Sequence, residues 1–501
     1  MSHDHSTPDD REDLDEDLLD AAEAAEIVPD VEDEDDPMDS DPGDAPEDEL
    51  EGEDEQIQLH NDSMAHFDHH SDSVFCIAQH PTQPFTIATG GGDDTAYVFS
   101  SDYPAPLLPT SYESNPSSHP RETLRPIAKL TGHTDSVNAI AFTLPAGDFL
   151  LTGGLDGQLR VFDAANPSYP FIASARECDD VNFLIACPNV DSYPNTFAVG
   201  ASDGSVWVYS LQVGDPSNPL QVLQVFNLHT QSCTAGAWTP DGKMLATVGE
   251  DGSLYVWDPF GDAAAAGITG AQGSQAIVSL TVSDQRFAVD GGLYSVGVAP
   301  NGAFVAVGGA GGMIRIVGLP RIGDSPSAVP GVKGGGSKNK SGGNRNVAGL
   351  SGNASAGQAG QILASLQAQA DSIETLTFSS PPLTLLAAGS VDGTIALFDT
   401  AHRFAVRRNI RDAHDGHAVV KVAFSPNNAE GHLLTTCGLD GVVRRWDVRR
   451  GTAAAGQGLV RGWKGHRGDG EKGGVLGFVQ KGDRIVTAGD DGVSLVFDAS
   501  T

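Results

Sequence analysis

Histidine, threonine and aspartate recur together along this chain in an order that could support nucleophilic catalysis. Two sets also carry a tryptophan: His229, Thr247, Asp251 and Trp257, and Thr436, Asp440 and Trp446 with either His414 or His417. Two further sets have phenylalanine at the tryptophan position: His133, Thr152, Asp156 and Phe162, and His466, Thr487, Asp491 and Phe497. A hydroxyl nucleophile needs one base oriented by one carboxylate. Because the set repeats along the chain, we predict that it is not catalytic and that the protein is not an enzyme.

Two other features could bind a phosphate or a metal. The glycine-rich run Gly308–Gly312 lacks the Lys-Ser/Thr pair of a phosphate-binding loop, and it occupies the place of a tight turn. His66, His69 and His70 lie close together in the sequence, but no further Cys or His at zinc-ligand spacing completes a site. We therefore predict no metal and no cofactor.

The elements that carry these residues are eight copies of a hairpin. Each copy reads small-Gly-x-Asp-Gly, then alternating apolar residues, then an aromatic residue that is often followed by Asp. Asp-Gly supplies the positive backbone dihedral of a two-residue turn, and the flanking alternation is typical of strands. The turn positions are Asp93, Asp156, Asp203, Asp251, Gly311, Asp392, Asp440 and Asp491. Four of the seven intervals are about 50 residues long, which fits a four-stranded propeller blade with a usual period of about 40 to 45 residues.

These copies resemble the repeats of the WD-repeat family. Trp257-Asp258 and Trp446-Asp447 retain the Trp-Asp ending of that repeat, and Phe-Asp or Tyr-Ser replaces it elsewhere. The resemblance implies an all-β fold, a WD40 β-propeller of eight four-stranded blades over residues 61–501. It also implies that the recurring His, Thr, Asp and Trp positions are structural. The fifth copy has Gly311 at the Asp position and no aromatic residue, so we expect it to be the least firmly held blade.

The first 60 residues differ in composition from the rest of the chain. They hold 27 acidic residues and one basic residue, Arg11, out of totals of 68 and 29. Few apolar side chains interrupt them, so we predict that residues 1–60 are a disordered acidic tail. Residues 320–361, rich in Gly, Ser and Asn, are predicted to be a flexible loop insertion. The proline-rich stretch Ser100–Arg125 is also predicted to be a loop.

Composition also bears on compartment and partners. No apolar run approaches the roughly 18 residues of a membrane span, and the first residues are acidic rather than signal-like. Five scattered cysteines are typical of reduced thiols. We expect a soluble, monomeric cytoplasmic protein, with a nuclear pool left open, that contacts no membrane. The net charge of −39 repels phosphate backbones, so no direct nucleic-acid binding is expected. The arginines of residues 403–411 and 444–450 are interpreted as solvated strand and loop charges.

The two ends of the propeller are expected to close it. An open ring would expose unpaired strand edges. The last copy reaches Thr501 directly after its third predicted strand. We therefore predict that a strand within Asn61–Phe67 completes the last blade.

Carboxylates gather on the face where the hairpin turns and the loops that enter each first strand emerge. This acidic rim consists of Asp72, Asp135, Asp179, Asp180, Glu250, Asp290, Asp371, Glu374, Asp469, Glu471 and Asp490. A ring of carboxylates around a central depression attracts cations and speeds encounter with a basic peptide. Each acid taken singly is an ordinary surface charge, whereas the set predicts a peptide-binding surface.

Two segments resemble one WD-repeat family in particular. After the acidic N-terminal region come HSDSVFC at His70–Cys76 and TGGGDDTAYVF at Thr89–Phe99. Both are similar to the angio-associated migratory cell protein family, whose fungal members are dedicated chaperones of the large-subunit ribosomal protein L-ten (universal L-sixteen). The resemblance implies a ribosome assembly factor. Its acidic face would capture the basic N-terminal segment of the client, as a nascent chain or for delivery to the pre-60S particle. On the residues alone, a scaffold in signalling or cell migration and a chaperone or reader of histone tails stay open.

Overall fold

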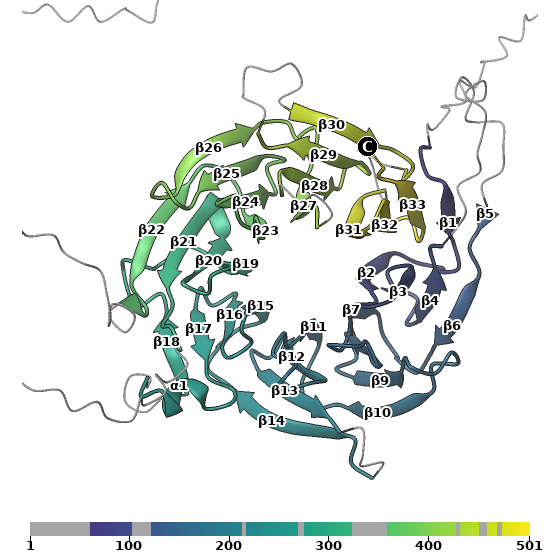
Figure 1. Cartoon of the computed structure of the whole chain (residues 1–501), viewed down its shortest axis with the longest axis horizontal. Helices are drawn as coiled ribbons and strands as arrows, with labels where there is room; N and C mark the ends of the chain where they lie inside the picture. Colours follow the sequence, from purple (N-terminus) through teal and green to yellow (C-terminus); the bar gives the residue numbers. More distant parts are fainter. Residues whose placement is uncertain are drawn as a thin grey trace, which may run out of the picture. The chain divides into compact units, whose positions relative to one another are not determined.

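The structure is a computed structural model that describes residues 61–102, 122–212, 217–268, 275–322, 358–426, 431–449, 458–467 and 473–500. These residues form eight β-sheets arranged as a ring around a central axis (Figure 1). The predicted all-β, eight-bladed propeller is therefore confirmed. The predicted acidic tail, most of the 320–361 insertion and the rim residues Asp469 and Glu471 lie outside the described residues.

Each blade has its first strand beside the central axis and its fourth strand on the outside (Figure 1). Blade 1 contains β2 (Val74–Gln79), β3 (Thr86–Gly91), β4 (Ala96–Ser100) and β6 (Pro126–Leu130). Blade 2 contains β7 (Val137–Phe142), β8 (Phe149–Gly154), β9 (Leu159–Asp163) and β10 (Phe171–Ala175). Blade 3 contains β11 (Val181–Ala186), β12 (Thr196–Ala201), β13 (Val206–Leu211) and β14 (Leu220–Phe226). Blade 4 contains β15 (Cys233–Trp238), β16 (Leu245–Gly249), β17 (Leu254–Trp257) and β18 (Ala276–Leu280).

The second half of the ring repeats this order. Blade 5 contains β19 (Leu293–Val298), β20 (Phe304–Gly309), β21 (Met313–Gly318) and β22 (Ile362–Gln367). Blade 6 contains β23 (Ile373–Phe378), β24 (Leu385–Ser390), β25 (Ile395–Asp399) and β26 (Ala405–Ile410). Blade 7 contains β27 (Val419–Phe424), β28 (Leu433–Gly438), β29 (Val443–Asp447) and β30 (Leu459–Trp463). Blade 8 contains β31 (Val475–Lys481), β32 (Arg484–Gly489), β33 (Ser494–Asp498) and β1 (Ala65–Phe67). One short helix, α1 (Asp262–Ala265), lies between β17 and β18.

The hydrophobic core lies between neighbouring blades. Second strands such as β3, β8 and β12 are buried along their whole length because a blade packs against each of their faces. They consequently read as runs of small and apolar residues rather than as an alternating pattern. One core cluster joins Val443 and Trp463 of blade 7 to Phe478 and Phe497 of blade 8. No single blade could bury this surface alone.

The predicted closure of the ring is confirmed. Strand β1 pairs antiparallel with β33, with Ala65 opposite Val496 and Phe67 opposite Ser494. Phe67 is fully buried and its ring stacks on Phe99 of blade 1, with ring centroids 4.2 Å apart. The first strands contact one another all the way round, including β31 with β2. The N-terminal strand therefore completes blade 8.

Blade 8 also has a fifth strand that sequence reasoning missed. Strand β5 (Glu122–Thr123) pairs parallel with β1, and the Leu124 N–H donates to the His66 carbonyl at 2.8 Å. The interpretation of Ser100–Arg125 as a loop is therefore wrong at its C-terminal end. A strand of two residues has no alternation of apolar and polar side chains that could reveal it.

The glycine-rich run of blade 5 is its hairpin turn, as predicted. Gly311 and Gly312 adopt φ of 62° and 71° within a 3-10 turn over Ala310–Gly312. A Cβ at Gly312 would lie 2.0 Å from the Gln369 carbonyl oxygen, so only glycine fits there. The 320–361 insertion connects β21 to β22 of the same blade. In the described part of the chain, no helix is long and apolar enough to span a membrane.

Candidate peptide-binding face

Eight equivalent hydrogen bonds place the hairpin turns beside the loops that enter the first strands. In each blade, the N–H of the residue before the turn position donates to a carbonyl at the strand entrance, at 2.9–3.0 Å. The donor and acceptor pairs are Gly92–Ser73, Leu155–Ser136, Ser202–Asp180, Glu250–Ser232, Ala310–Gly292, Val391–Ser372, Leu439–Ala418 and Asp490–Gly474. Both sets of loops therefore lie on one face of the ring, which we call the entrance face.

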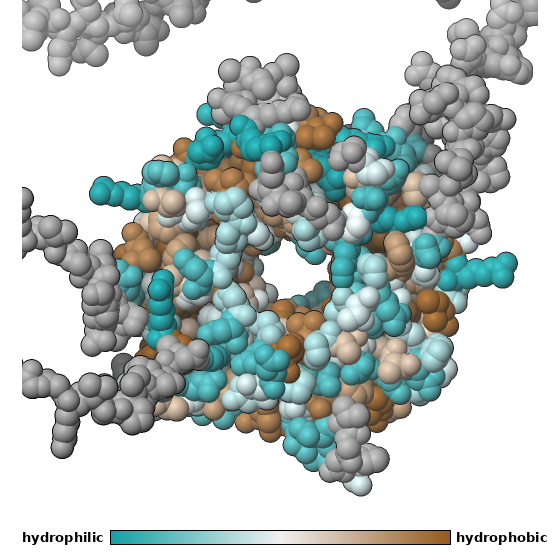
Figure 2. All heavy atoms as spheres, viewed as in Figure 1, coloured by the Kyte–Doolittle hydropathy of each residue, from teal (hydrophilic) through white to brown (hydrophobic). Residues whose placement is uncertain are grey.

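The nine described carboxylates of the acidic rim lie in these turns, entrance loops and first-strand starts. Asp180 and Asp490 are partly exposed, and the other seven are exposed. A central opening passes through the ring, and hydrophilic side chains border much of it (Figure 2). Solvent-exposed carboxylates of one sign around such an opening focus negative potential on it.

Local hydrogen bonds hold three of these carboxylates at the entrance to the first strand of their blades. Asp72, Asp135 and Asp371 each precede a serine, and one carboxylate oxygen accepts the N–H of that serine at 2.7–2.8 Å. The serine is followed by Val or Ile, which begins the first strand. The short sequence Asp-Ser-Val/Ile therefore fixes an acid at the same place in blades 1, 2 and 6.

Asp490 has a structural contact in addition to its place on the rim. The hydroxyl of Ser73 in blade 1 donates to Oδ1 of Asp490 at 2.6 Å and lies 3.0 Å from its carbonyl oxygen. This contact joins blades 8 and 1, the two blades that meet where the ring closes. A change at Asp490 should consequently affect stability.

Glu374 occupies a position that recurs in all eight blades. Every first strand has a one-residue register shift between its first and third residues, so its second residue is the extra residue of a β-bulge. The bulge residues are Phe75, Asn138, Asn182, Thr234, Tyr294, Glu374, Val420 and Leu476. Bulges re-aim side chains, and here they do so at the inner edge of the entrance face. Glu374 is the acid of this set.

The Glu374 carboxylate lacks a compensating cation. Among the described residues, none forms a hydrogen bond or ion pair with it, although the side chain is exposed. Removal of water by the surrounding protein raises its pKa, and the nearby charge of Asp371 raises it further. A positively charged ligand would relieve both effects.

The repeated His, Thr, Asp and Trp residues form hydrogen-bond networks inside the blades. His229 lies 2.9 Å from Thr247 and 3.5 Å from Asp251, and Trp257 donates to Thr247 at 2.8 Å. In blade 7, His414 rather than His417 bonds Asp440 and Thr436, each at 2.9 Å, and Trp446 donates to Thr436 at 3.0 Å. The sets of His133 and His466 make the same bonds without a tryptophan donor. These side chains are largely enclosed, and the same bonds recur in four blades.

Blade 1 contains a fifth network that the sequence patterns did not single out. His70 lies 3.0 Å from both Asp93 and Thr89. Burial opposes ionisation of Asp93, but hydrogen bonds from His70, Thr95 and the Ser71 N–H outweigh it and lower its pKa to about 2. His66 lies instead 2.9 Å from Thr123. His66 and His70 therefore bond to different strands.

The arginine clusters are not all solvated, which corrects the sequence interpretation. Arg408 and Arg445 are buried, and they donate to the carbonyls of Asp447 and Ala499 at 3.2 and 2.9 Å. Arg444 forms ion pairs with Asp440 and Asp415. Arg408 therefore joins blade 6 to blade 7, and Arg445 joins blade 7 to the chain that follows β33 of blade 8.

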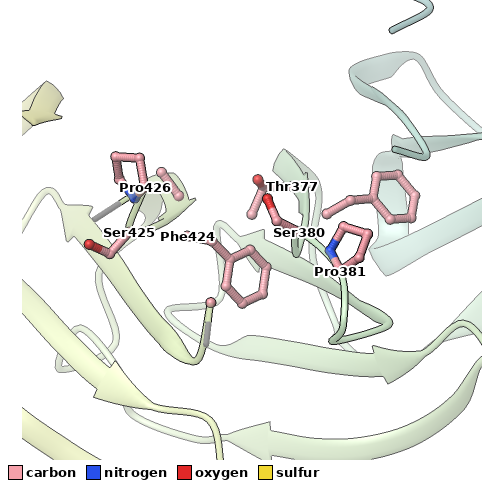
Figure 3. Close-up of a pocket in the computed structure, with 9 residues that line it drawn as sticks. Thr377, Ser380, Pro381, Phe424, Ser425 and Pro426 are labelled. Atoms are coloured by element: carbon pink, nitrogen blue, oxygen red, sulfur yellow. The ribbon is translucent and has the colours of Figure 1, made fainter. Parts of the chain in front are cut away.

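A small cavity lies at the other end of the first strands. It has a volume of about 210 Å³ and is lined by Thr377, Phe378, Ser380, Pro381, Ala423, Phe424, Ser425, Pro426 and Gly431 (Figure 3). Thr377 and Phe378 end the strand β23 in which Glu374 is the second residue. The cavity is therefore on the opposite face from the acidic rim.

Known proteins share this architecture over nearly its full length. The family model described as WD domain, G-beta repeat matches residues 61–100, 124–163, 220–258, 360–399 and 408–447. The crystal structure of Chaetomium thermophilum Sqt1 bound to the N-terminus of the ribosomal protein L10 is 50% identical in sequence, with a TM-score of 0.73. The match covers 88% of this chain and 100% of that one. This chain belongs to the Sqt1 family of WD-repeat proteins.

More distant relatives agree with the Sqt1 assignment. The ribosome assembly protein SQT1 of Saccharomyces cerevisiae is 26% identical over 487 residues, which cover 90% of this chain and 91% of the yeast protein. The human angio-associated migratory cell protein is 24% identical over 441 residues, covering 87% of this chain and 80% of the human one. The family resemblance read from His70–Cys76 and Thr89–Phe99 is thereby confirmed.

Proposed function

We propose that this chain is a ribosome assembly factor, a dedicated chaperone of a large-subunit ribosomal protein of the L10 type. Its acidic rim binds the basic N-terminal segment of that client, as a nascent chain or before delivery to the pre-60S particle. The observation that carries the proposal is the ring of exposed carboxylates on the entrance face. It occurs in a chain half identical to an Sqt1 that was crystallised with the L10 N-terminus.

The physical need for such a protein follows from the charge of its client. A free ribosomal protein has an RNA-binding surface of Lys and Arg that associates with any polyanion. A negative cradle masks that surface until the client reaches its site. Glu374 is suited to this role because its unpaired carboxylate gains a cation on binding.

The same function assigns a role to the remaining parts of the chain. Residues 61–501 are the binding propeller, and the 320–361 insertion is a loop on it. Residues 1–60 are an acidic tail that raises the rate of encounter with a basic client. We place this monomeric, non-catalytic protein in the cytoplasm, where ribosomal proteins are synthesised, with a nuclear pool as a second location. The propeller is a scaffold that many binding proteins share.

Affinity purification of the full chain with mass spectrometry tests the client. We expect one stoichiometric ribosomal protein of the large subunit. A histone, or a heterogeneous set of signalling proteins, would contradict the proposal in favour of the corresponding alternative.

Calorimetric titration tests the binding face. Reversing the charge of Glu374, Asp490, Glu250 or Asp135 to Lys should weaken binding of the client's N-terminal segment, by tenfold or more at the central acids. Unchanged affinity in all four variants would move the site to another face of the ring.

A further inference from the structure

The bulge residues of blades 1 to 7 fall into two groups, according to whether the bulge side chain or the next residue contacts the following blade. In blades 2, 3 and 4 the bulge side chain donates to a backbone carbonyl of the next blade. Asn138 donates to Val181 at 3.3 Å, Asn182 to Cys233 at 2.9 Å, and Thr234 to Leu293 at 2.6 Å. These side chains fasten one blade to the next and are thereby occupied.

In blades 1, 5, 6 and 7, the third residue of the first strand makes the inter-blade contact. Cys76 donates to the Val137 carbonyl at 3.4 Å, Ser295 to Ile373 at 2.7 Å, and Lys421 to Phe478 at 3.0 Å. In blade 6, the Thr375 hydroxyl accepts the Val422 N–H at 3.3 Å. The neighbouring bulge residues therefore do not make this contact between blades. They are Phe75, Tyr294, Glu374 and Val420.

Three consecutive blades present apolar side chains at their bulge positions and in the turn beside them. We call the set the apolar arc: Val420 and Leu439 of blade 7, Leu476 of blade 8 and Phe75 of blade 1. Leu439 is 40% exposed and Phe75 is 38% exposed, and Val420 and Leu476 are partly exposed. Large apolar side chains gathered at one rim, unlike single ones, mark an interaction surface.

Close contacts tie this arc to the acidic rim. A Cβ at Gly474 would lie 2.7 Å from the Leu439 side chain, which places Leu439 against the entrance of blade 8. A Cβ at Gly92 would lie 3.2 Å from the Phe75 ring and 3.1 Å from the Asp72 carboxylate, which places that ring beside an acid. In the order of the blades, Glu374 of blade 6 comes just before the apolar arc. Asp490 of blade 8 and Asp72 of blade 1 lie in the last two of the three blades that form the arc.

We propose that the apolar arc is a subsite for an apolar side chain of the bound basic segment, held between cations that pair with Glu374 and with Asp490. This inference rests on the proposed function and adds a specificity rule to it. Charge alone would accept any Arg/Lys-rich peptide, including a histone tail. A segment that also places an apolar residue between its cations gains burial of Phe75 and Leu476, and polybasic chains without such a residue do not.

Salt dependence separates the two parts of the surface. The probe is a synthetic peptide with the N-terminal sequence of the L10 protein of the same organism, titrated into the full chain at low and high salt. Phe75→Ser and Leu476→Ser should each weaken binding roughly tenfold at both salt concentrations, because burial of apolar area is not screened. Glu374→Gln should weaken binding mainly at low salt. Leu223→Ser is the matched control, since Leu223 is 37% exposed on the outer strand β14.

A scan of the peptide makes the test independent of folding defects in the variants. Serine replacement of one apolar peptide residue should weaken binding to the unaltered chain roughly tenfold, and much less to Phe75→Ser, because the two changes remove the same contact. The subsite would be overturned if the unaltered chain binds the peptide and neither arc variant nor any peptide replacement changes the affinity. No binding by the unaltered chain at all would instead contradict the proposed function.

Discussion

Reversal of the charge at Glu374 is the sharpest test of the binding face. Its side chain is the acid at a bulge position, and its carboxylate pairs with no cation in the described part of the chain. A close, desolvated charge pair contributes about 2 to 5 kcal/mol when one partner is reversed, and exposure of Glu374 places it near the lower value. About 2 kcal/mol corresponds to a roughly 30-fold increase in Kd. Glu374→Gln removes attraction without adding repulsion, so we expect roughly a fivefold increase.

The same residue gives a pH dependence of known sign. Desolvation and the charge of Asp371 raise the pKa of Glu374 in the free protein, and a bound cation lowers it again. The complex therefore binds fewer protons than the free protein, and affinity should rise with pH through the titration of Glu374. Glu374→Gln should remove this part of the pH dependence. The Tm of the Glu374→Gln variant should not fall, because desolvation and the charge of Asp371 make the ionised Glu374 carboxylate unfavourable in the folded protein.

Isothermal titration calorimetry with the client's N-terminal segment measures both effects, and thermal unfolding measures Tm. Asp483→Lys is the matched control, since it reverses an exposed charge at the other end of β31, away from the acidic rim. Equal Kd values for the unaltered chain, Glu374→Gln and Glu374→Lys at low salt would refute the reasoning. A large decrease in the Tm of Glu374→Gln would also refute it, because it would show that the carboxylate stabilises the fold.

Three further predictions concern stability and the tail. Asp440→Ala removes the partner of His414 and Arg444, so unfolding by denaturant should show a loss of about 2 to 4 kcal/mol, with peptide affinity of the folded protein unchanged. The Tm should fall as the pH is lowered from about 6.5, because burial lowers the folded-state pKa of His133 and His414 and the unfolded chain then binds more protons. A flat Tm between pH 7 and pH 5 would contradict this. Deletion of residues 1–55 should leave a folded protein that still binds, with slower association and weaker salt dependence in stopped-flow measurements. Complete loss of binding at low salt would make the tail the site.

The repeating architecture follows from local patterns in the sequence. Each hairpin is local, because an Asp-Gly turn and two alternating strands lie within a short stretch of chain, and eight such stretches predict eight blades. The missing fourth strand of the last copy likewise predicted a closing strand near Phe67, since an unpaired edge in a ring has to find a partner. The grouping of carboxylates on one face followed from the position of turns and entrance loops within each repeat.

Contacts between separated parts of the chain depend on the tertiary structure. His414 rather than His417 bonds Asp440, and the strand Glu122–Thr123 pairs with β1, because packing brings these groups together from separated parts of the chain. The bulge in each first strand is invisible in the sequence, since its register depends on the neighbouring strand. Whether a bulge residue fastens the next blade, as Asn182 does, or stays exposed, as Glu374 and Phe75 do, depends on the contacts that the next blade offers. Local patterns therefore fix the blades, and the packing between blades fixes which side chains remain for a ligand.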